Sequence, residues 1–406
     1  MPMNPELAAL KPYPFEKLAA LKAGVTPPAT MEHIPLSIGE PRHAPPNAVL
    51  ETLRRHEGDV ARYPATAGLL ELRQAMADWT GRRFGLAAGS LDPERHVLPV
   101  NGTREAIFAF VQAALDRTRP ARVAMPNPFY QIYEGATLLA GGQPLYLDCR
   151  ADHGFRPNLE AVPADVWRDT QIVFVCSPGN PTGAVTPLED FTRLIELADE
   201  FDFIVASDEC YSELYLDERA PPPGLLQACA ALGRHDYRRC IVFHSLSKRS
   251  NLPGLRSGFV AGDAELIEPF KRYRTYHGCA MPLQVQHASI VAWNDEQHVR
   301  ANRDAYREKF SAVTEILAPA MDFPTPKASF YLWPAVPGGD DEAFARDLFA
   351  EQHVTVLPGR YMSRDSAAGG KLCNPGSGRV RLALVAELDA TVEAASRIRR
   401  FIESRA

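Results

Sequence analysis

Three short apolar segments of this chain are each followed at once by residues that can do chemistry. Asn180 comes soon after Ile172–Cys176, and Asp208 and Tyr211 come after Phe203–Ser207. A third segment ending at His244 is followed by hydroxyl and cationic side chains, namely Ser245, Ser247, Lys248 and Arg256. Open α/β sheets bind ligands at the carboxyl ends of their strands, so these side chains are expected to converge. Their convergence predicts a site for a small molecule.

Lys248 is the candidate nucleophile of this site. It lies in sequence among hydroxyls and cations, including Ser245 and Arg249. Such neighbours lower the pKa of an amine and make it more reactive toward a carbonyl carbon. An isolated lysine is more often a solvated surface group. Because Lys248 stands at a strand end between residues suited to phosphate, we favour the chemical role.

A phosphate is the anion that the surrounding residues would bind best. Hydroxyls and a planar guanidinium match its geometry, and the sequence offers Ser245, Ser247 and Arg256. Thr103 and Arg104 begin a predicted helix after Gly102 and could add backbone N–H groups. The alternatives are that the serines only cap the strand end and that Thr103 is a simple helix N-cap.

Asp208 and two tyrosines suggest a flat, charged ring. Asp208 follows the apolar run FIVAS, where a carboxylate is costly unless it meets a cation such as a protonated pyridine nitrogen. Tyr211 could donate to a phenolate oxygen of the ring, and Tyr130 could stack on its face. The alternative roles are a turn cap for Asp208 and plain packing for the tyrosines.

The elements that would position these residues alternate between strand and helix from about residue 45 to 285. Strands are predicted at Arg122–Met125, Pro144–Cys149, Ile172–Cys176, Phe203–Ser207, Ile241–Ser245 and Gly258–Gly262. Helices are predicted at Asn47–Glu57, Gly68–Arg83, Thr103–Asp116 and Leu188–Glu200. This alternation is typical of an α/β domain with a mostly parallel central sheet and helices on both faces.

The remainder of the chain predicts a smaller α+β domain. Helices are expected at Glu296–Leu317, Asp341–Glu351 and Leu388–Arg405, with strands at Ala328–Trp333, Val354–Leu357 and Val380–Leu384. We therefore predict a large domain over residues 45–290 and a small domain built from residues 1–44 and 291–406.

Composition excludes several classes of protein. The 406 residues carry a formal charge of −6, with 46% hydrophobic residues, which gives no electrostatic footprint for nucleic acid. No apolar stretch is long enough for a membrane span, and the N-terminus does not read as a secretory signal. The seven cysteines are odd in number and contain no C-x-x-C pair. We expect a cytoplasmic protein with reduced, mostly buried thiols and no metal site.

Seven segments, in family order, resemble the class I/II aminotransferases among the fold-type I pyridoxal 5'-phosphate (PLP) enzymes. They are RYPATAGLLELR, NGTREA, PNPFYQIY, SPGNPTG, SDECY, SLSKRSNLPGLRSGF and GRVRLAL. Any one segment is a weak signal, but together they cover nearly the whole chain. The resemblance implies the PLP-dependent transferase fold of type I, with PLP as cofactor and small amino and keto acids as substrates.

The resemblance also implies roles around the cofactor ring. Lys248 would hold the cofactor aldehyde covalently and then carry the substrate proton. Asp208 would pair with the pyridine nitrogen and keep the ring electron-poor. Asn180 and Tyr211 would hydrogen-bond the ring oxygen, and Tyr130 would stack on the ring. Lys248, Asp208 and Tyr211 are thus the expected catalytic residues.

Further roles concern the two anions. The cofactor phosphate would be held by Gly102, Thr103, Arg104, Ser245, Ser247 and Arg256, and by Tyr63 of a neighbouring subunit, so a homodimer with composite sites is expected. Arg381, favoured over Arg379, would clamp the substrate α-carboxylate beside Asn180 and the backbone of Gly39. Many relatives carry a second basic residue nearer the phosphate arginine. Arg104 could compensate for its absence through its side chain, or act through its backbone alone.

Among family members the chain looks most like the N-succinyldiaminopimelate aminotransferases of bacterial lysine biosynthesis. The implied reaction converts N-succinyl-LL-2,6-diaminopimelate and 2-oxoglutarate into N-succinyl-2-amino-6-oxopimelate and glutamate. Arg42, Arg274 and Arg360 are candidates for the distal carboxylate. The alternatives are a broader aspartate, alanine or aromatic aminotransferase, a PLP β-lyase and a non-catalytic PLP-binding regulatory module. A dinucleotide oxidoreductase is disfavoured, because no G-x-G-x-x-G follows an early strand.

Overall fold

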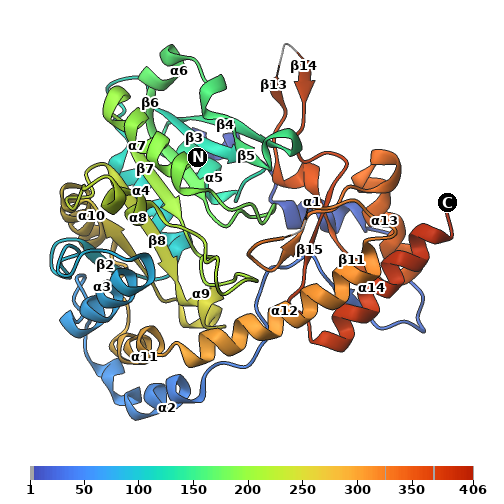
Figure 1. The fold of residues 1–406 in the computed structure, drawn as a ribbon, viewed down its shortest axis with the longest axis horizontal. Helices are drawn as coiled ribbons and strands as arrows, with labels where there is room; N and C mark the ends of the chain where they lie inside the picture. Colours follow the sequence, from blue (N-terminus) through green and yellow to red (C-terminus); the bar gives the residue numbers. More distant parts are fainter. Residues whose placement is uncertain (1–3, 325, 369–370, 406) are drawn as a thin grey trace.

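An eight-stranded sheet forms the centre of the larger part of the molecule (Figure 1). The computed structural model describes residues 4–324, 326–368 and 371–405. The strand order is β2-β9-β8-β7-β6-β3-β4-β5, and only β9 and β5 run antiparallel to their neighbours. The strands are β2 Val97–Val100, β3 Arg122–Asn127, β4 Gln143–Arg150, β5 Arg156–Pro157, β6 Thr170–Cys176, β7 Ile204–Asp208, β8 Cys240–Ser245 and β9 Gly258–Gly262.

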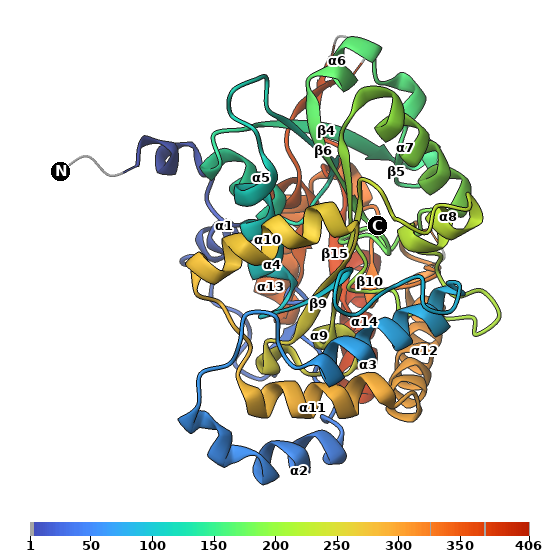
Figure 2. The same ribbon diagram turned by 90° about the vertical axis from the view of Figure 1, so that its left-hand side faces the viewer.

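Helices cover both faces of this sheet, because its strands are apolar on both sides. Along β6, Ile172 and Phe174 join one buried cluster, whereas Val173 and Val175 join another. The first cluster lies under α4 Thr103–Ala114, α5 Ile132–Leu139 and α10 Ala264–His277 (Figure 2). The second lies under α3 Leu70–Phe84, α7 Leu188–Phe201, α8 Leu225–Ala231 and α11 Leu283–Asn294, and α2 Asn47–Arg55 packs against α11. The predicted α/β fold class is confirmed.

Two strands of the sheet, β2 and the two-residue edge strand β5, escaped the sequence prediction. Strand β2 has four residues, one of which is Pro99, so its apolar pattern is too short to stand out. It is nevertheless important, because β2 runs parallel to β8 across the antiparallel β9. Its carboxyl end therefore brings Asn101 and Gly102 to the same edge of the sheet as the ends of β6, β7 and β8.

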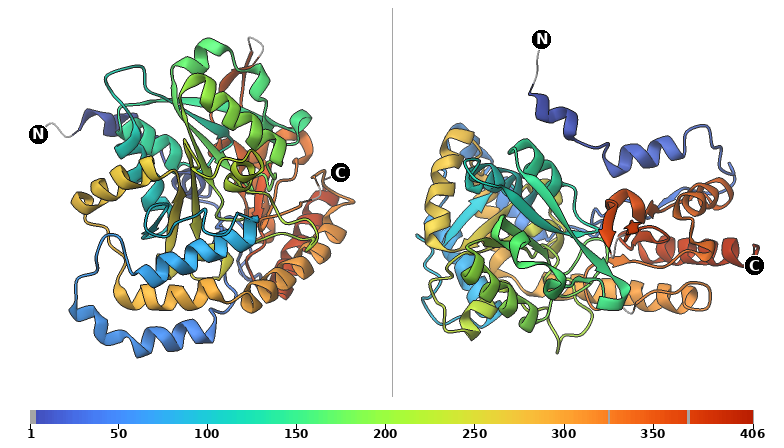
Figure 3. Two further views of the ribbon diagram at one scale, coloured as in Figure 1. Left: turned by 60° about the vertical axis from the view of Figure 1, so that its left-hand side comes forward. Right: turned by 90° about the horizontal axis from the view of Figure 1, so that it is seen from above.

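The C-terminal region forms smaller sheets with helices beside them. Strand β15 Val380–Ala383 pairs with β10 Tyr331–Leu332 and β12 Leu357–Pro358, and β13 Ser366–Ala368 pairs with β14 Lys371–Cys373. The helices here are α12 Gln297–Leu317, α13 Asp341–Gln352 and α14 Leu388–Glu403. In the N-terminal segment, α1 is Pro14–Leu21, and β1 Ile34–Pro35 pairs with β11 Val354–Thr355. Figure 3 shows this segment lying beside the C-terminal elements. The domain boundaries themselves stay a prediction.

Two predicted strands of this region are shorter than expected. The strand predicted at Ala328–Trp333 is reduced to β10, because Ser329 has a φ of +73° that interrupts the extended backbone. The strand predicted at Val354–Leu357 is divided between β11 and β12, which pair with different strands.

Short helices complete the chain. They are α6 Ala164–Arg168 and α9 Leu246–Arg249, together with 3-10 turns at Pro5–Ala9, Glu57–Ala61, Ala151–His153, Leu159–Ala161, Pro253–Leu255, Pro337–Gly339 and Gly359–Met362.

The cysteines and the helix lengths bear on two further predictions. All seven cysteines are free thiols, but only Cys149, Cys229 and Cys240 are buried, so the expectation that most are buried was wrong. Four lie at partly accessible positions near loops or the cavity described below. Every helix within the described residues is too short or too polar to span a bilayer. The cytoplasmic location stays a prediction.

Candidate active site

The carboxyl ends of β2, β6, β7 and β8 meet at one cavity of about 580 Å³. This arrangement follows from the parallel direction of these strands, which turns their polar end residues toward one edge. The residues predicted from sequence that line the cavity are Gly39, Thr103, Arg104, Tyr130, Asn180, Asp208, Tyr211, Ser245, Ser247, Lys248, Arg256 and Arg381. The structure therefore brings together side chains that are spread over more than 300 positions of the sequence.

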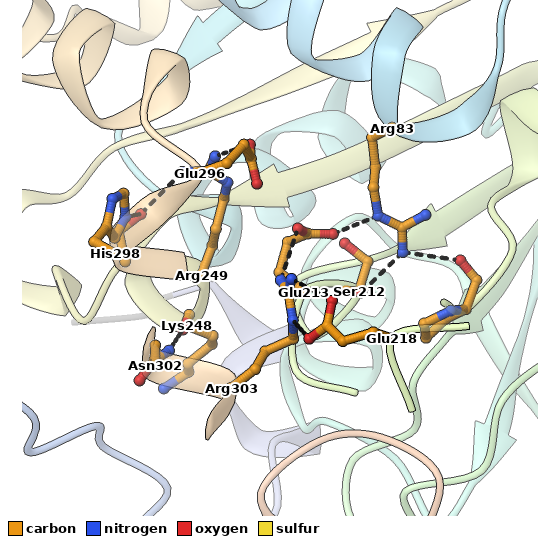
Figure 4. Close-up of polar contacts among 12 residues, drawn as sticks. Arg83, Ser212, Glu213, Glu218, Lys248, Arg249, Glu296, His298, Asn302 and Arg303 are labelled. Atoms are coloured by element: carbon orange, nitrogen blue, oxygen red, sulfur yellow. Dashed lines mark hydrogen bonds and ion pairs between the residues drawn. The ribbon is translucent and has the colours of Figure 1, made fainter. Parts of the chain in front are cut away.

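Lys248 lies on α9, directly after β8, and its amine points into the cavity. Its Nζ donates a hydrogen bond to the carbonyl oxygen of Gly39. Burial is the main reason that the pKa of Lys248 falls to about 8, and Arg381 and Arg104 lower it further. The adjacent Arg249 does not contribute from the cavity side, because it turns away to pair with Glu296, as Figure 4 shows. The predicted lowering of the pKa of Lys248 is therefore present, but its principal cause is burial and not the neighbouring cations in the sequence.

Asp208 ends β7 and is buried beneath the cavity. Its Oδ2 accepts a 2.8 Å hydrogen bond from the Tyr133 hydroxyl, and its Oδ1 accepts one from the backbone N–H of Cys210. Burial raises the pKa of Asp208, and these hydrogen bonds oppose that rise. Asp208 does cap a turn at Cys210, but it has no ion-pair partner among the residues that the structure describes. A carboxylate in that position can still accept a cation from the cavity.

The candidate anion site is built around Gly102, which caps the N-terminus of α4. Gly102 has a φ of +84°, and a Cβ added there would lie 2.1 Å from Nη2 of Arg256. The Arg256 guanidinium donates to the carbonyl oxygens of Asn101 and Pro253. Thr103 is not the N-cap, which corrects the simpler reading of that residue, and its Oγ1 lies 3.0 Å from Sγ of Cys210.

Hydroxyls complete the candidate anion site from the opposite side. Ser245 caps α9 by accepting a 3.0 Å hydrogen bond from the backbone N–H of Ser247. Its own hydroxyl donates to Oγ of Ser247 at 2.8 Å. Both serines line the cavity, so capping does not remove them from it. The Arg104 side chain donates to the Tyr130 hydroxyl, so the prediction that Arg104 acts through its backbone stays open.

Arg381 lies at the far wall of the cavity. Its Nη1 donates to Oδ1 of Asn180 at 2.9 Å, and its Nη2 donates to the carbonyl oxygen of Ser37. Arg379 instead donates to the carbonyl oxygen of Trp333 and does not line the cavity. Of the two arginines considered from sequence, only Arg381 is therefore placed to meet a ligand carboxylate.

Several residues of the cavity were missed by the sequence analysis. The hydroxyls of Tyr331 and Tyr211 lie 3.0 Å apart, and a Cβ on Gly39 would lie 2.0 Å from the Tyr331 hydroxyl. Gly39 is thus required by a close approach of Tyr331 to the backbone. Tyr133, at the start of α5, was also missed; it is fully buried behind the cavity and supports it by donating to Asp208. Tyr331 offered no local signal.

Other predicted residues lie outside the cavity. Tyr63 is fully exposed, and Arg274 is buried in an ion pair with Glu105. Arg360 is paired with Asp341 and Glu342. The absence of a metal site stays a prediction, since two groups of side chains away from the cavity have the spacing of metal ligands: His56, Asp59 and His287, and Glu105, His277 and Cys279.

Comparisons with known proteins agree with this geometry. Residues 32–395 match the family described as aminotransferase class I and II. An aminotransferase from Neisseria meningitidis, known from a crystal structure, is 50% identical and covers 98% of this chain and 100% of its own, with a TM-score of 0.93. The LL-diaminopimelate aminotransferase of Nitratidesulfovibrio vulgaris is 34% identical over 97% of each chain.

A third relative has a title close to the reaction implied by the sequence. It is a probable N-succinyldiaminopimelate aminotransferase from Thermus thermophilus, 28% identical, which covers 95% of this chain and 99% of its own with a TM-score of 0.82. The fold, the sheet-edge cavity and these matches agree on one family. The chain belongs to the class I and II aminotransferases, PLP-dependent enzymes that act on amino and keto acids.

Proposed function

We propose that transamination in this protein runs on Lys248, Asp208 and Arg381, with a substrate of the diaminopimelate class. The observation that carries the proposal is the Lys248 amine, whose pKa is lowered to about 8 in a cavity that also holds a buried acid and a carboxylate-binding arginine. An amine with this pKa is partly neutral near pH 7, as a proton acceptor must be.

The cavity residues fit PLP. Asp208 is a buried carboxylate with a raised pKa, and a protonated pyridine nitrogen would supply the cation that it lacks among the described residues. The Ser245 hydroxyl and the Arg256 guanidinium offer donors for a phosphate beside the Cβ-free backbone of Gly102. Asn180 and Tyr211 offer an amide and a hydroxyl for the ring oxygen. This donor set supports the roles that the family resemblance implies for Asp208, Ser245, Arg256, Asn180 and Tyr211.

When bound, PLP supplies an electron sink for the bond between the substrate α-carbon and its hydrogen. Lys248 Nζ would take up that proton and release it again within the cavity. Asp208, which burial shields from water, would hold a proton on the pyridine nitrogen. Arg381 would bind the α-carboxylate with two parallel N–H groups, which requires it to share or release Asn180 and the carbonyl of Ser37.

The finer proposal is the pair N-succinyl-LL-2,6-diaminopimelate and 2-oxoglutarate. It is supported by the names of two relatives, an LL-diaminopimelate aminotransferase and a probable N-succinyldiaminopimelate aminotransferase. Of the three arginines considered for the distal carboxylate, Arg42 alone is exposed and has no ion-pair partner among the described residues. It lies two positions from Glu40, which lines the cavity. Arg42 itself does not line the cavity, and we propose it for the distal carboxylate of a substrate that extends beyond the lining residues.

The test combines trapping with a substrate screen. Borohydride treatment of the holoenzyme should reduce the cofactor onto Lys248, to be located by peptide mass spectrometry. A coupled assay should then show higher kcat/KM for the succinylated substrate than for LL-diaminopimelate, aspartate, alanine or phenylalanine. Arg42→Met should raise KM for the succinylated substrate about tenfold or more but leave KM for glutamate unchanged. The control is Arg300→Met, an exposed arginine on α12.

Each outcome has a clear meaning. Label on another residue would refute the assignment of Lys248. A preference for LL-diaminopimelate, with Arg42→Met behaving like Arg300→Met, would overturn the succinylated substrate but not the aminotransferase. Equal rates on aromatic substrates would support the broader alternative.

We also propose a homodimer with shared sites. Tyr63 is fully exposed and does not line the cavity of its own chain, although the family resemblance places it at the cofactor phosphate. Tyr63 would instead reach the cofactor phosphate in the cavity of a neighbouring subunit. Tyr63→Phe should weaken PLP binding without changing folding, and sedimentation of the protein should give twice the 44.8 kDa of the chain. A monomer with full PLP affinity would refute this proposal.

A further inference from the structure

Helix α12 carries a buried lysine for which the transamination scheme has no use. Lys309 is 2% exposed and does not line the cavity. A buried ammonium group needs an acceptor. Its Nζ lies 2.7 Å from Nε2 of His43, and Glu387 is the carboxylate whose charge favours the ammonium form. Burial nevertheless lowers the pKa of Lys309 to about 8.

His43 also contacts Asn302, the residue of α12 that lies next to the backbone of Lys248. Its Nδ1 lies 2.7 Å from Oδ1 of Asn302, which also accepts a hydrogen bond from Asn251. Burial lowers the pKa of His43, and so does the charge of Lys309, and both effects favour the neutral ring. If Nε2 accepts from Lys309, the ring proton must be on Nδ1, where Asn302 accepts it.

The orientation of Asn302 then follows. With two donors directed at its Oδ1, its amide nitrogen faces the backbone carbonyl oxygen of Lys248 at 3.4 Å, as drawn in Figure 4. The contact is long for a hydrogen bond, but it joins α12 to the short helix α9 that carries the lysine. Nearby, Arg303 holds the same part of α12 through a two-point ion pair with Glu218.

His43 also ends a segment that covers the cavity. The carbonyl oxygen of Ser37 accepts from Arg381, and the carbonyl oxygen of Gly39 accepts from Nζ of Lys248. The centroid of the His43 ring lies 4.6 Å from the ring centroid of Tyr306 on α12. The side chain of His43 therefore attaches this segment to α12. Helix α12 also contacts α9, through the amide of Asn302 and the carbonyl oxygen of Lys248.

We propose that His43 is a positioning residue that fixes the Ser37–His43 segment and α9 relative to each other, and thereby sets the place of the Lys248 amine. The proposal rests on the proposed role of Lys248. Because a displacement of about 1 Å can cost up to about 100-fold in rate, two hydrogen bonds far from the reacting atoms can matter.

Three substitutions separate the contacts of His43. His43→Phe keeps a ring against Tyr306 and removes both hydrogen bonds. His43→Asn places an amide nitrogen where Nδ1 stands, so it keeps the donor to Asn302. His43→Gln places its amide where Nε2 stands, so it keeps only the contact with Lys309. The matched control is His33→Phe, another histidine of the N-terminal segment, which bonds Thr355 instead.

The readouts are kcat and KM, the thermal unfolding of the apoenzyme, and a pH titration of the absorbance of the cofactor bound to the holoenzyme. We expect His43→Phe and His43→Gln to lower kcat about tenfold and to leave KM for glutamate unchanged within about twofold. We expect the same two variants to move the titration midpoint by about half a pH unit or more. The Asn variant and His33→Phe should match the parent in kcat and in the midpoint.

Two results would overturn the inference. Parental kcat and midpoint in both His43→Phe and His43→Gln would refute it. A His43→Asn enzyme as impaired as His43→Phe, at equal apoenzyme stability, would refute it as well. These results differ from a failure of the proposed function. In that case the parent enzyme would not be trapped on Lys248 by borohydride, and the role of His43 would fall together with that of the lysine.

Discussion

Gly102 offers the sharpest test of the candidate phosphate site. An added Cβ would lie 2.1 Å from Nη2 and 2.8 Å from Cζ of Arg256, which no real contact permits. The backbone of Asn101 and Gly102 is held at the end of β2, so the mobile partner is the arginine side chain. Gly102→Ala should therefore displace the Arg256 guanidinium while leaving Lys248 and Asp208 in place.

The size of the effect has two parts. The backbone of Gly102, with φ +84° and ψ 155°, lies in a region that is essentially restricted to glycine, so an alanine there costs about 1–3 kcal/mol of folding free energy. A lost charge-assisted hydrogen bond to the phosphate costs about 1.5–3 kcal/mol. At 1.4 kcal/mol for each factor of ten, that second part weakens PLP binding by about 10- to 150-fold. The first part alone would leave PLP affinity unchanged.

The chain provides a control that separates these parts. Gly24 has a φ of +77° with no atom within 4 Å of an added Cβ, so Gly24→Ala carries backbone strain without displacing a ligand-binding side chain. Apoenzyme should be titrated with PLP by absorbance, and unfolding should be measured with and without PLP. We expect both variants to lose apoenzyme stability and only Gly102→Ala to lose affinity for PLP. Equal PLP affinity in the two would refute the placement of the phosphate at Gly102 and Arg256.

Three other predictions follow from the same cavity. Arg381→Lys should raise KM for glutamate about tenfold, because a point charge cannot replace a bidentate fork, whereas Arg379→Lys should not; steady-state kinetics with an unchanged KM for Arg381→Lys would move the clamp elsewhere. Tyr133→Phe should raise the pKa of Asp208 further and cost about 1–2 kcal/mol in urea unfolding, and an unchanged midpoint would show that the 2.8 Å hydrogen bond contributes nothing. Below pH 8, the apo form of Lys248→Met should be more stable than the parent by up to about 3 kcal/mol. The reason is that a lysine whose pKa falls from 10.5 to about 8 on folding is charged below pH 8 in both the folded and the unfolded protein, so the folded parent bears the full cost of burying that charge. The parent should catch up as pH rises from 8 to 10.5, where only its unfolded state stays charged; a gap that is constant from pH 7 to 10 would contradict the lowered pKa.

Much of the candidate site follows from local sequence. Asp208 is the last residue of a buried strand, Asn180 and Lys248 stand just beyond two others, and β6, β7 and β8 are neighbours in the sheet. A parallel α/β sheet must bring such residues to one edge, so recognising the strands was enough to predict their convergence. Gly102 and Thr103 were found through their motif, even though the strand before them was too short to be recognised.

The sequence by itself thus determined the family, the fold class and the line of residues along the sheet edge, because these depend on short motifs and on their order along the chain. Only the tertiary structure decided what surrounds them. Burial, rather than neighbouring cations in sequence, is the main cause of the lowered pKa of Lys248. The contacts between Tyr133 and Asp208 and between His43 and Lys309 join residues far apart in the chain. Such contacts depend on how helices and loops pack in space, and a single sequence carries no local signal of that packing.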